Sequence, residues 1–447
     1  MSINPEIFRS YDIRGTYPDE LNEEAAYAIG RAFVRKSQTK EVVVGSDMRL
    51  SGPSLKTKLI KGITDEGAKV FDIGLVSIDT IYFAVGILGH QAGIMITASH
   101  NPKEYNGFKM VLKDMQWIRG EDLKDDVLNL PALSAEAKGS VEKLDIMPQF
   151  IDHLLSFVDV SLIKPFKVIV DAGNGMAGKI IPLLEPHLPI KVTRLNFELD
   201  GSFPAHPSNP LLPESQRQVI AAVLEEQADF GVIFDGDTDR LNFIDEQGQF
   251  IKGDIGMLLL AKEFLKREPG KGISYNVSCS KIVPEKIKEW GGVPLRSKVG
   301  YVNVSDAMRD NDGIMGGEIS SHYSFRDNAY ADSGFIAFLI LLQLISSENK
   351  PLSEIVKPWL RYYKAPEENI RVENRQKIFA IIEGFKHKYT DGQQDELDGL
   401  TVQYQDWWFN VRPSNTEPLL RITIEADSPE LLDNKLAELK DFALSLK

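Results

Sequence analysis

Two short apolar runs in this chain each lead directly into a polar loop. Residues 92–96 (AGIMI) precede the loop 97–102 (TASHNP), and residues 230–234 (FGVIF) precede the loop 235–240 (DGDTDR). Short apolar runs bounded by turn-forming residues are typical of buried strands. Because open α/β sheets bind ligands at the carboxyl ends of their strands, the pattern predicts an α/β fold with its chemistry in these two loops.

Helix-like and strand-like segments alternate along most of the chain, as in α/β architecture. In the first part the expected segments are helices over 22–36 and 53–66 and strands over 41–45 and 69–73. The apolar run 335–342 is too short to span a bilayer and predicts a buried helix. Ser428 and Pro429 predict the N-cap and first residue of the last helix.

Ser99 is a candidate nucleophile because its hydroxyl follows closely on the first apolar run. A plain polar turn is the alternative, since serine, histidine, asparagine and proline are all common in turns. This loop alone leaves both interpretations open.

The second loop carries three carboxylates at alternate positions, Asp235, Asp237 and Asp239. Carboxylate oxygens are hard ligands, and Mg²⁺ favours a few of them together with a phosphate oxygen. A solvated acidic turn is the alternative, but three such charges after a buried strand repel one another unless a cation or Arg240 offsets them. The spacing therefore predicts a divalent-metal site.

A third loop lies between the strand-like runs 407–411 and 419–424. Guanidinium forks, hydroxyls, an amide and backbone N–H groups together suit a phosphate dianion. The alternative is that these are ordinary surface arginines that aid solubility. That interpretation accounts for either arginine alone but not for the hydroxyls clustered beside them. The residues expected to form this phosphate cradle are Arg412, Ser414, Asn415, Thr416 and Arg421.

The fourth polar loop spans residues 316–322 (GGEISSH). Glu318 and Ser320 can exchange hydrogen bonds with sugar hydroxyls, and His322 can titrate near neutrality. By itself this segment indicates only a loop, and it gains weight as the fourth member of the set.

These four loops, in this order, resemble those of the α-D-phosphohexomutase superfamily, most closely its bacterial phosphomannomutase/phosphoglucomutase branch. Residues 8–15 (FRSYDIRG) and 105–109 (YNGFK) extend the resemblance to nearly the whole chain. It implies four domains around a central cleft, three related α/β domains with mixed sheets and a C-terminal α+β domain. The expected domain limits are 1–145 for the domain with the serine loop and 146–246 for the domain with the metal loop. They are 247–360 for the domain with the sugar loop and 361–447 for the domain with the phosphate loop.

The resemblance also implies a function. It is reversible intramolecular phosphoryl transfer between hexose 1-phosphate and hexose 6-phosphate, of mannose, glucose or both, through phosphoserine at Ser99 and a hexose 1,6-bisphosphate intermediate. One Mg²⁺ per chain would be held by Ser99, Asp235, Asp237 and Asp239, with hexose 1,6-bisphosphate as activator. A phosphoglucosamine mutase is an alternative, and so are a metal-dependent sugar phosphatase and a catalytically silent sugar-phosphate binding protein.

Further roles follow from the same resemblance. Lys109 would be the acid/base group near the serine or simply a charge partner of phosphoserine, with His100 and His322 as alternative acid/base groups. A lysine serves as a base only if its pKa is lowered. Arg14 would offset the phosphoserine charge. The residues expected to bind the sugar are Tyr11, Arg240, Tyr301, Glu318, Ser320 and His322.

Two positions depart from the family pattern. Tyr301 stands where many phosphomannomutases and phosphoglucomutases have a histidine, and a phenol is a poor base at neutral pH. Ser278 stands where a lysine is usual, with Lys281 nearby. Substrate preference is the property that we expect these two changes to affect most.

Composition fits such an enzyme. The 447 residues exceed what one hydrophobic core supports, and the net charge of −14 argues against nucleic acid as the main partner. The single cysteine, Cys279, excludes internal disulfides and fits a buried residue in a reducing cytosol. We therefore expect a cytoplasmic monomer or weak homodimer that acts on small phosphohexoses, without nucleic acid or membrane partners.

Overall fold

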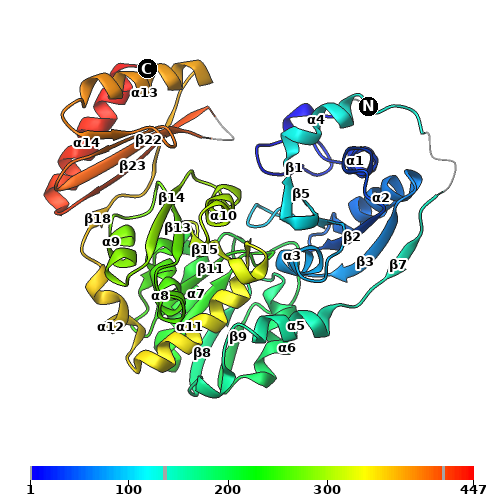
Figure 1. Ribbon diagram of the computed structural model, residues 1–447, viewed down its shortest axis with the longest axis horizontal. Coiled ribbons are helices and arrows are strands. Elements are labelled where there is room, and N and C mark those ends of the chain that lie inside the picture. The colour runs from blue at the N-terminus through cyan, green and yellow to red at the C-terminus, as the bar shows by residue number, and fades with distance from the viewer. Residues whose placement is uncertain (1–2, 134–137, 415–417) are drawn as a thin grey trace.

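The computed structural model describes residues 3–133, 138–414 and 418–447, which form four lobes, each built on one β-sheet (Figure 1). The fold class expected from the sequence is confirmed: three mixed sheets with helices are followed by an antiparallel sheet with helices. We call these lobes the first to fourth domains.

The first domain has a seven-stranded sheet of order β1-β5-β4-β2-β3-β7, with β6 paired to β5. Its strands are β1 (Ile13–Thr16), β2 (Glu41–Ser46), β3 (Lys69–Leu75), β4 (Ala92–Ile96), β5 (Tyr105–Leu112), β6 (Gln116–Ile118) and β7 (Val141–Lys143). Its helices are α1 (Glu23–Ser37), α2 (Gly52–Asp65), α3 (Ile78–Gly86) and α4 (Gly120–Leu128).

The second domain has a five-stranded sheet of order β12-β11-β10-β8-β9. Its strands are β8 (Phe166–Asp171), β9 (Ile190–Leu195), β10 (Phe230–Phe234), β11 (Leu241–Asp245) and β12 (Phe250–Ile251). Its helices are α5 (Met147–Leu155), α6 (Ala177–Leu184) and α7 (Pro213–Glu226). Since β12 pairs with β11, this sheet runs past the limit at residue 246 that the sequence suggested.

The third domain has a sheet of order β14-β13-β15-β16-β17. Its strands are β13 (Gly272–Asn276), β14 (Val293–Ser297), β15 (Gly313–Gly317), β16 (Tyr323–Phe325) and β17 (Ala331–Asp332). Its helices are α8 (Gly253–Arg267), α9 (Ile282–Glu289), α10 (Tyr301–Asp310), α11 (Gly334–Glu348) and α12 (Leu352–Val356).

The fourth domain has an antiparallel sheet of order β18-β23-β22-β21-β20, with β19 paired to β23. Its strands are β18 (Tyr363–Lys364), β19 (Glu368–Arg371), β20 (Gln393–Asp395), β21 (Leu400–Gln403), β22 (Trp407–Pro413) and β23 (Leu419–Ala426). Its helices are α13 (Arg375–Lys388) and α14 (Pro429–Ser445).

The first three domains share one strand pattern. In each, a central strand pairs in parallel with two neighbours, and one of these neighbours pairs antiparallel with the next strand along the chain. The strand before that antiparallel partner is β4, β10 or β15. The serine, metal and sugar loops follow these three strands, so each loop occupies the same topological position in its own domain.

The hydrophobic core joins the first three domains and leaves the fourth separate. One cluster of buried side chains includes residues from the first, second and third sheets, whereas a second cluster lies wholly within the fourth domain. Helix α11 is buried from Gly334 to Ser346, as its apolar run predicted, and Cys279 is buried with a free thiol. Among the described residues no single helix is long and apolar enough to cross a bilayer, and the bent pair that passes by length and composition turns by 87°.

The N-cap of α14 gives a local test of the fourth domain. The Ser428 side chain accepts a hydrogen bond from Leu431 N at 3.2 Å. Replacing it in Ser428→Ala should lower the free energy of local opening of the first turn of α14 by about 1 kcal/mol, because an N-cap acceptor is lost. Hydrogen–deuterium exchange of this turn measures the effect. Ser445→Ala, at the other end of α14, is the control, and equal changes in the two variants would contradict the cap.

Candidate active site

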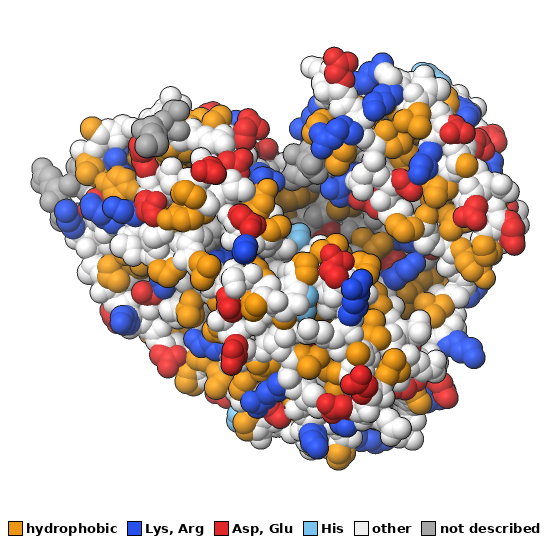
Figure 2. Space-filling model, turned by 180° about the vertical axis from the view of Figure 1, so that it is seen from behind, with side chains coloured by type: hydrophobic (Ala, Val, Ile, Leu, Met, Phe, Trp, Pro, Cys, Tyr) orange, Lys and Arg blue, Asp and Glu red, His pale blue; other side chains and the backbone are white. Residues whose placement is uncertain are grey.

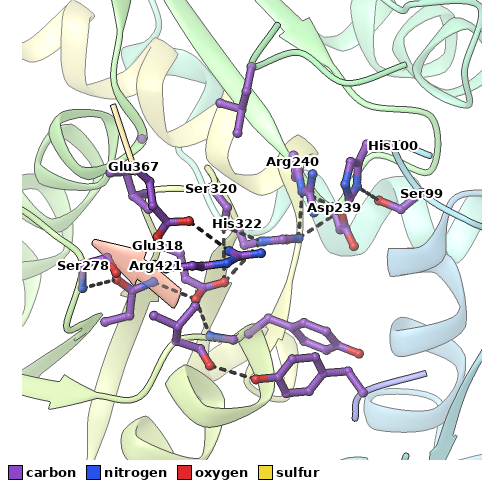
Figure 3. Close-up of a pocket in the computed structure, with 18 of the residues that line it drawn as sticks. Ser99, His100, Asp239, Arg240, Ser278, Glu318, Ser320, His322, Glu367 and Arg421 are labelled. Atoms are coloured by element: carbon purple, nitrogen blue, oxygen red, sulfur yellow. Dashed lines mark hydrogen bonds and ion pairs between the residues drawn. The ribbon is translucent and has the colours of Figure 1, made fainter. Parts of the chain in front are cut away.

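A cleft of about 870 Å³ is lined by residues from the four polar loops, among them Ser99, Arg240, Glu318 and Arg421. Figure 2 shows the surface hollowed between the lobes of the molecule. In Figure 3 the labelled side chains from separate elements point toward one another across this space. The fold therefore brings together four segments that lie far apart in the sequence.

Ser99 is held between two loops. It is almost fully buried and has a left-handed backbone with φ of 50°. Its Oγ lies 3.3 Å from His100 Nδ1 (Figure 3). The same Oγ donates to Asp235 Oδ2 at 2.7 Å, and the backbone N–H of Ser99 donates to Thr97 Oγ1 at 2.9 Å. The candidate nucleophile thus contacts the candidate metal loop directly.

The three carboxylates of the metal loop converge as their spacing predicted. Asp235, Asp237 and Asp239 are buried, and each offers an oxygen within 4.8 Å of the others. Burial, followed by the charges of Asp239 and Asp237, raises the pKa of Asp235 well above its usual value. Asp237 Oδ1 is buried, and no described residue donates a hydrogen bond to it. Clustered oxygens with spare acceptor capacity fit a divalent cation.

Lys109 supplies positive charge to this loop. Its Nζ lies 2.8 Å from Asp237 Oδ2 and 2.6 Å from Asp239 Oδ2. Burial opposes the ammonium charge, but the two carboxylates outweigh burial and raise the pKa of Lys109 above 10.5. A catalytic base needs the opposite shift, so the geometry favours the charge-partner alternative for Lys109.

Two helix N-termini from different domains hold the backbone of the metal loop. Ile78 N, in the first turn of α3, donates to Asp237 O at 3.1 Å, and Gly334 N, in the first turn of α11, donates to Thr238 O at 3.1 Å. The Ser333 hydroxyl, the N-cap of α11, donates to the buried Asp79 of α3 at 2.8 Å. The first and third domains therefore meet behind the loop of the second.

Arg14 and His100 flank Ser99. Arg14 Nη1 donates to Asn101 Oδ1 at 2.6 Å, and the guanidinium is also paired with Asp12. Burial, with the nearby charges of Arg240 and Arg14, holds the pKa of His100 well below its usual value of 6.5. The imidazole beside Ser99 Oγ is therefore neutral at pH 7.

The sugar loop contacts the metal loop through His322. Glu318 Oε1 accepts from Asn276 Nδ2 at 2.8 Å and from Gly300 N at 2.7 Å, and Ser320 Oγ lies 2.8 Å from His322 Nδ1. Burial alone would lower the pKa of His322, but Asp239 and Glu318 raise it to about 10. The His322 Nε2 lies 3.4 Å from Asp239 Oδ1 and accepts from Arg240 Nε at 3.1 Å.

Tyr301 forms an aromatic wall between the first and third domains. Its ring centroid lies 6.1 Å from that of Tyr11, 5.3 Å from that of Trp117 and 6.0 Å from that of His322. Burial raises the pKa of the Tyr301 phenol above 10, so it stays neutral. Tyr11 lines the cleft and donates to Val299 O at 2.9 Å.

The described part of the phosphate cradle comes from β22 and β23. Arg412 and Arg421 face each other as a cross-strand pair, and Arg421 Nη2 donates to Ser414 Oγ at 3.4 Å. The carboxylate of Glu367 bridges both guanidinium groups, a contact that sequence reasoning missed. Asn415 and Thr416 lie outside the described residues.

Family models match the chain in four successive parts. These are the α/β/α domains I, II and III of phosphoglucomutase/phosphomannomutase, over residues 5–125, 148–248 and 252–362, and the C-terminal domain, over 367–441. This chain belongs to the phosphoglucomutase/phosphomannomutase family. The resemblance seen in the sequence is confirmed.

The chain is also similar to individual proteins of this family over most of its length. The chain is 39% identical over 436 residues to a phosphomannomutase of Salmonella montevideo, covering 95% of each protein. It is 37% identical over 440 residues to a phosphomannomutase/phosphoglucomutase of Pseudomonas aeruginosa, covering 96% of this chain and 93% of that protein. A crystal structure of a family protein from Burkholderia thailandensis superposes with a TM-score of 0.91 at 32% identity, covering 99% of this chain and 98% of that one.

Arg49 is a second residue that sequence reasoning missed. Its fully buried guanidinium donates to four carbonyls in and just after the serine loop: to Ser99 O and Asn101 O at 2.8 and 2.7 Å, and to Pro102 O and Tyr105 O at 2.8 and 2.9 Å. Its Nε also faces Asp47 at 3.4 Å. We call these four contacts the Arg49 clamp. Because all four acceptors are backbone atoms, the side-chain pattern of the sequence does not predict it.

Arg49→Lys should misplace Ser99, because an ammonium with three donors cannot serve four carbonyls arranged around a planar fork. We expect kcat for mutase turnover to fall by roughly 10²-fold with little change in KM, since small shifts of a reacting group are costly. Steady-state kinetics measures this. Arg35→Lys, on the surface of α1, is the matched control. Undiminished kcat in Arg49→Lys would show that the clamp does not position the serine.

Proposed function

We propose that the protein interconverts hexose 1-phosphate and hexose 6-phosphate by reversible intramolecular phosphoryl transfer, with mannose and glucose as the sugars. The observation that carries the proposal is the 2.7 Å hydrogen bond from Ser99 Oγ to Asp235, within a buried carboxylate cluster and at the cleft that Arg421 also lines. A nucleophile, a cation site and an anion site around one cleft are the parts that phosphoryl transfer between two positions of one sugar requires.

In the proposed cycle, Ser99 Oγ starts as a phosphate ester. The phosphohexose binds with its own phosphate at Arg412 and Arg421, and its free hydroxyl attacks the phosphorus of phosphoserine. The new sugar O–P bond forms as the Oγ–P bond breaks, which gives the hexose 1,6-bisphosphate. After this intermediate reorients, Ser99 Oγ attacks its other phosphorus, and the second sugar O–P bond breaks.

Asp235, Asp237 and Asp239, with an oxygen of the Ser99 group, would hold one Mg²⁺. A bound Mg²⁺ supplies electrostatic stabilisation of the negative charge on the transferred group and on the leaving oxygen. Lys109 and Arg240 offset the remaining acidic charge of the loop, since Arg240 Nε lies 3.9 Å from Asp235 and 4.0 Å from Asp239. Arg14, paired with Asn101, lies close enough to the loop to offset the phosphoserine charge.

Each transfer also moves a proton, because the sugar hydroxyl loses one as Ser99 Oγ gains one, and the reverse. We assign His100 to the serine side of this exchange. Its Nδ1 lies 3.3 Å from Ser99 Oγ, and its lowered pKa leaves the ring free to accept the serine proton at pH 7. This assignment replaces Lys109, whose pKa is raised.

Sugar recognition rests on Glu318 and Ser320, with His322 beside them and Tyr11 and Tyr301 as aromatic walls. Glu318 and Ser320 address hydroxyls that mannose and glucose share, so the difference at C2 is weakly distinguished. The proposal also includes hexose 1,6-bisphosphate as activator and a cytoplasmic monomer or weak homodimer without nucleic acid or membrane partners, in keeping with the net charge of −14. A phosphoglucosamine mutase is the main alternative.

A coupled assay tests this proposal with mannose, glucose and glucosamine 1-phosphates and a trace of hexose 1,6-bisphosphate. We expect turnover of the mannose and glucose esters with kcat/KM values within about two orders of magnitude, because one hydroxyl position separates them. A preference for the glucosamine ester would move the protein to the alternative. Release of inorganic phosphate in place of isomerised product would indicate a phosphatase.

A fraction of the purified protein should carry phosphate on Ser99, because the cycle starts from that state. Intact mass and peptide mapping measure this fraction. Ser99→Ala should lose both the modification and turnover, whereas Ser54→Ala, at a half-buried position of α2, should keep both. Phosphate found only on other residues, or full turnover by Ser99→Ala, would refute the central step.

Asp237→Asn should weaken Mg²⁺ binding and lower kcat by roughly 10²-fold or more, because the cation acts on the transition state. The KM for the sugar phosphate should change far less, since the cradle is untouched. Activity titrated with Mg²⁺ after EDTA treatment measures both effects, with Asp312→Asn on the surface as the control. Full activity in excess EDTA would exclude the metal assignment.

A further inference from the structure

Glu367 places a carboxylate between the two arginines of the phosphate cradle. Its Oε2 accepts from Arg412 Nη2 at 2.7 Å, and its Oε1 accepts from Arg421 Nη1 at 3.0 Å. Figure 3 shows the Glu367 side chain directed at the Arg421 guanidinium. Each carboxylate oxygen therefore uses an N–H group of a different arginine.

This glutamate is a member of the cleft and not a remote surface residue. It belongs to the segment between β18 and β19, and Glu367, Arg412 and Arg421 all line the cleft. The segment is anchored just before it, because Lys364 Nζ pairs with the buried Asp254 at 3.3 Å and Ala365 N donates to Ile424 O at 3.3 Å. The carboxylate is thus kept within reach of the arginines by its backbone.

The arginines differ in burial, and this decides what the carboxylate does. The side chain of Arg412 is 4% exposed, whereas those of Arg421 and Glu367 are 30% and 29% exposed. A buried guanidinium without an anion is costly, so Glu367 stabilises Arg412 in the absence of phosphate. Glu367 itself is exposed enough to turn toward solvent when a phosphate takes over the pairing of Arg412.

A phosphate and the Glu367 carboxylate cannot share these arginines without cost. Both are acceptors for the same N–H groups, and two anions held side by side repel each other. A phosphate dianion carries more charge and more acceptor oxygens than a carboxylate, so it can displace Glu367 from the arginines. When the phosphate leaves, the carboxylate can restore the pairs at once.

We propose that Glu367 sets the affinity of the cradle by competing with the substrate phosphate for Arg412 and Arg421, and that it takes the phosphate's place whenever the phosphate leaves. This inference rests on the proposed function, because the cradle must bind phosphate. In that cycle the bisphosphate has to release one phosphate from the cradle and present the other. A replacement acceptor lowers the barrier to that release, at the expense of weaker binding.

The test is Glu367→Gln, which keeps the shape of the side chain and removes its charge. We expect the inhibition constant of inorganic phosphate, and the KM values for mannose and glucose 1-phosphates, to fall by about 3- to 10-fold alike, because the Glu367 carboxylate no longer competes for the two arginines. We expect kcat to fall as well, since release becomes slower. A merely structural defect would raise KM.

Glu368→Gln is the matched control, because it removes the same charge from the next residue, whose carboxylate pairs with Lys440 at 3.1 Å. Its phosphate inhibition constant should stay at the wild-type value. Equal tightening in both variants, or no tightening in Glu367→Gln, would overturn the competition.

Arg421→Ala separates failure of this inference from failure of the proposed function. We expect it to raise the inhibition constant of inorganic phosphate by about 10-fold or more, because a charge-assisted contact is lost. If Arg421→Ala weakens phosphate binding while Glu367→Gln leaves it unchanged, the cradle stands and the competition is refuted. If Arg421→Ala has no effect, the cradle itself is refuted.

Discussion

The mutual repulsion of three buried carboxylates governs the arrangement of this molecule. Asp235, Asp237 and Asp239 lie within 4.8 Å of one another in a protein interior, where like charges interact strongly. The Lys109 ammonium comes from the first domain, the His322 imidazole from the third, and the N–H groups of α3 and α11 complete the surroundings. The metal loop of the second domain is therefore stabilised by groups of the first and third domains. A single charged cluster links the three domains.

The same dependence explains why the chemistry lies between domains. The serine, metal and sugar loops follow equivalent strands of three related sheets, so each sheet presents one loop at its carboxyl edge. None of these loops is complete alone: Ser99 finds its acceptor on Asp235, and His322 pairs with Asp239. The fourth domain has a separate core and contributes its arginines from outside this junction.

Sequence patterns predicted those features whose cause is local. The strands at 92–96 and 230–234 have the expected bounds, and the Ser428 cap is present, because apolar runs and capping residues act over a few positions. The convergence of the carboxylates followed from their spacing, and the four domains followed from family resemblance. Arg49 and Glu367 were missed because the backbone carbonyls and the guanidinium groups that they contact are distant in the chain. The domain limits stay predictions, and the two-residue strand β12, which pairs with β11 beyond residue 246, is too short to leave a sequence pattern.

The backbone of Ser99 restricts which nucleophile this loop can carry. With φ at 50°, the residue occupies a region that β-branched side chains avoid, because their Cβ substituents crowd the following carbonyl. Threonine has nearly the same hydroxyl chemistry and an equally usable phosphate ester, yet it would add backbone strain to the loop that Arg49 clamps. The conformation of this turn therefore favours serine over threonine independently of the reactivity of their hydroxyl groups.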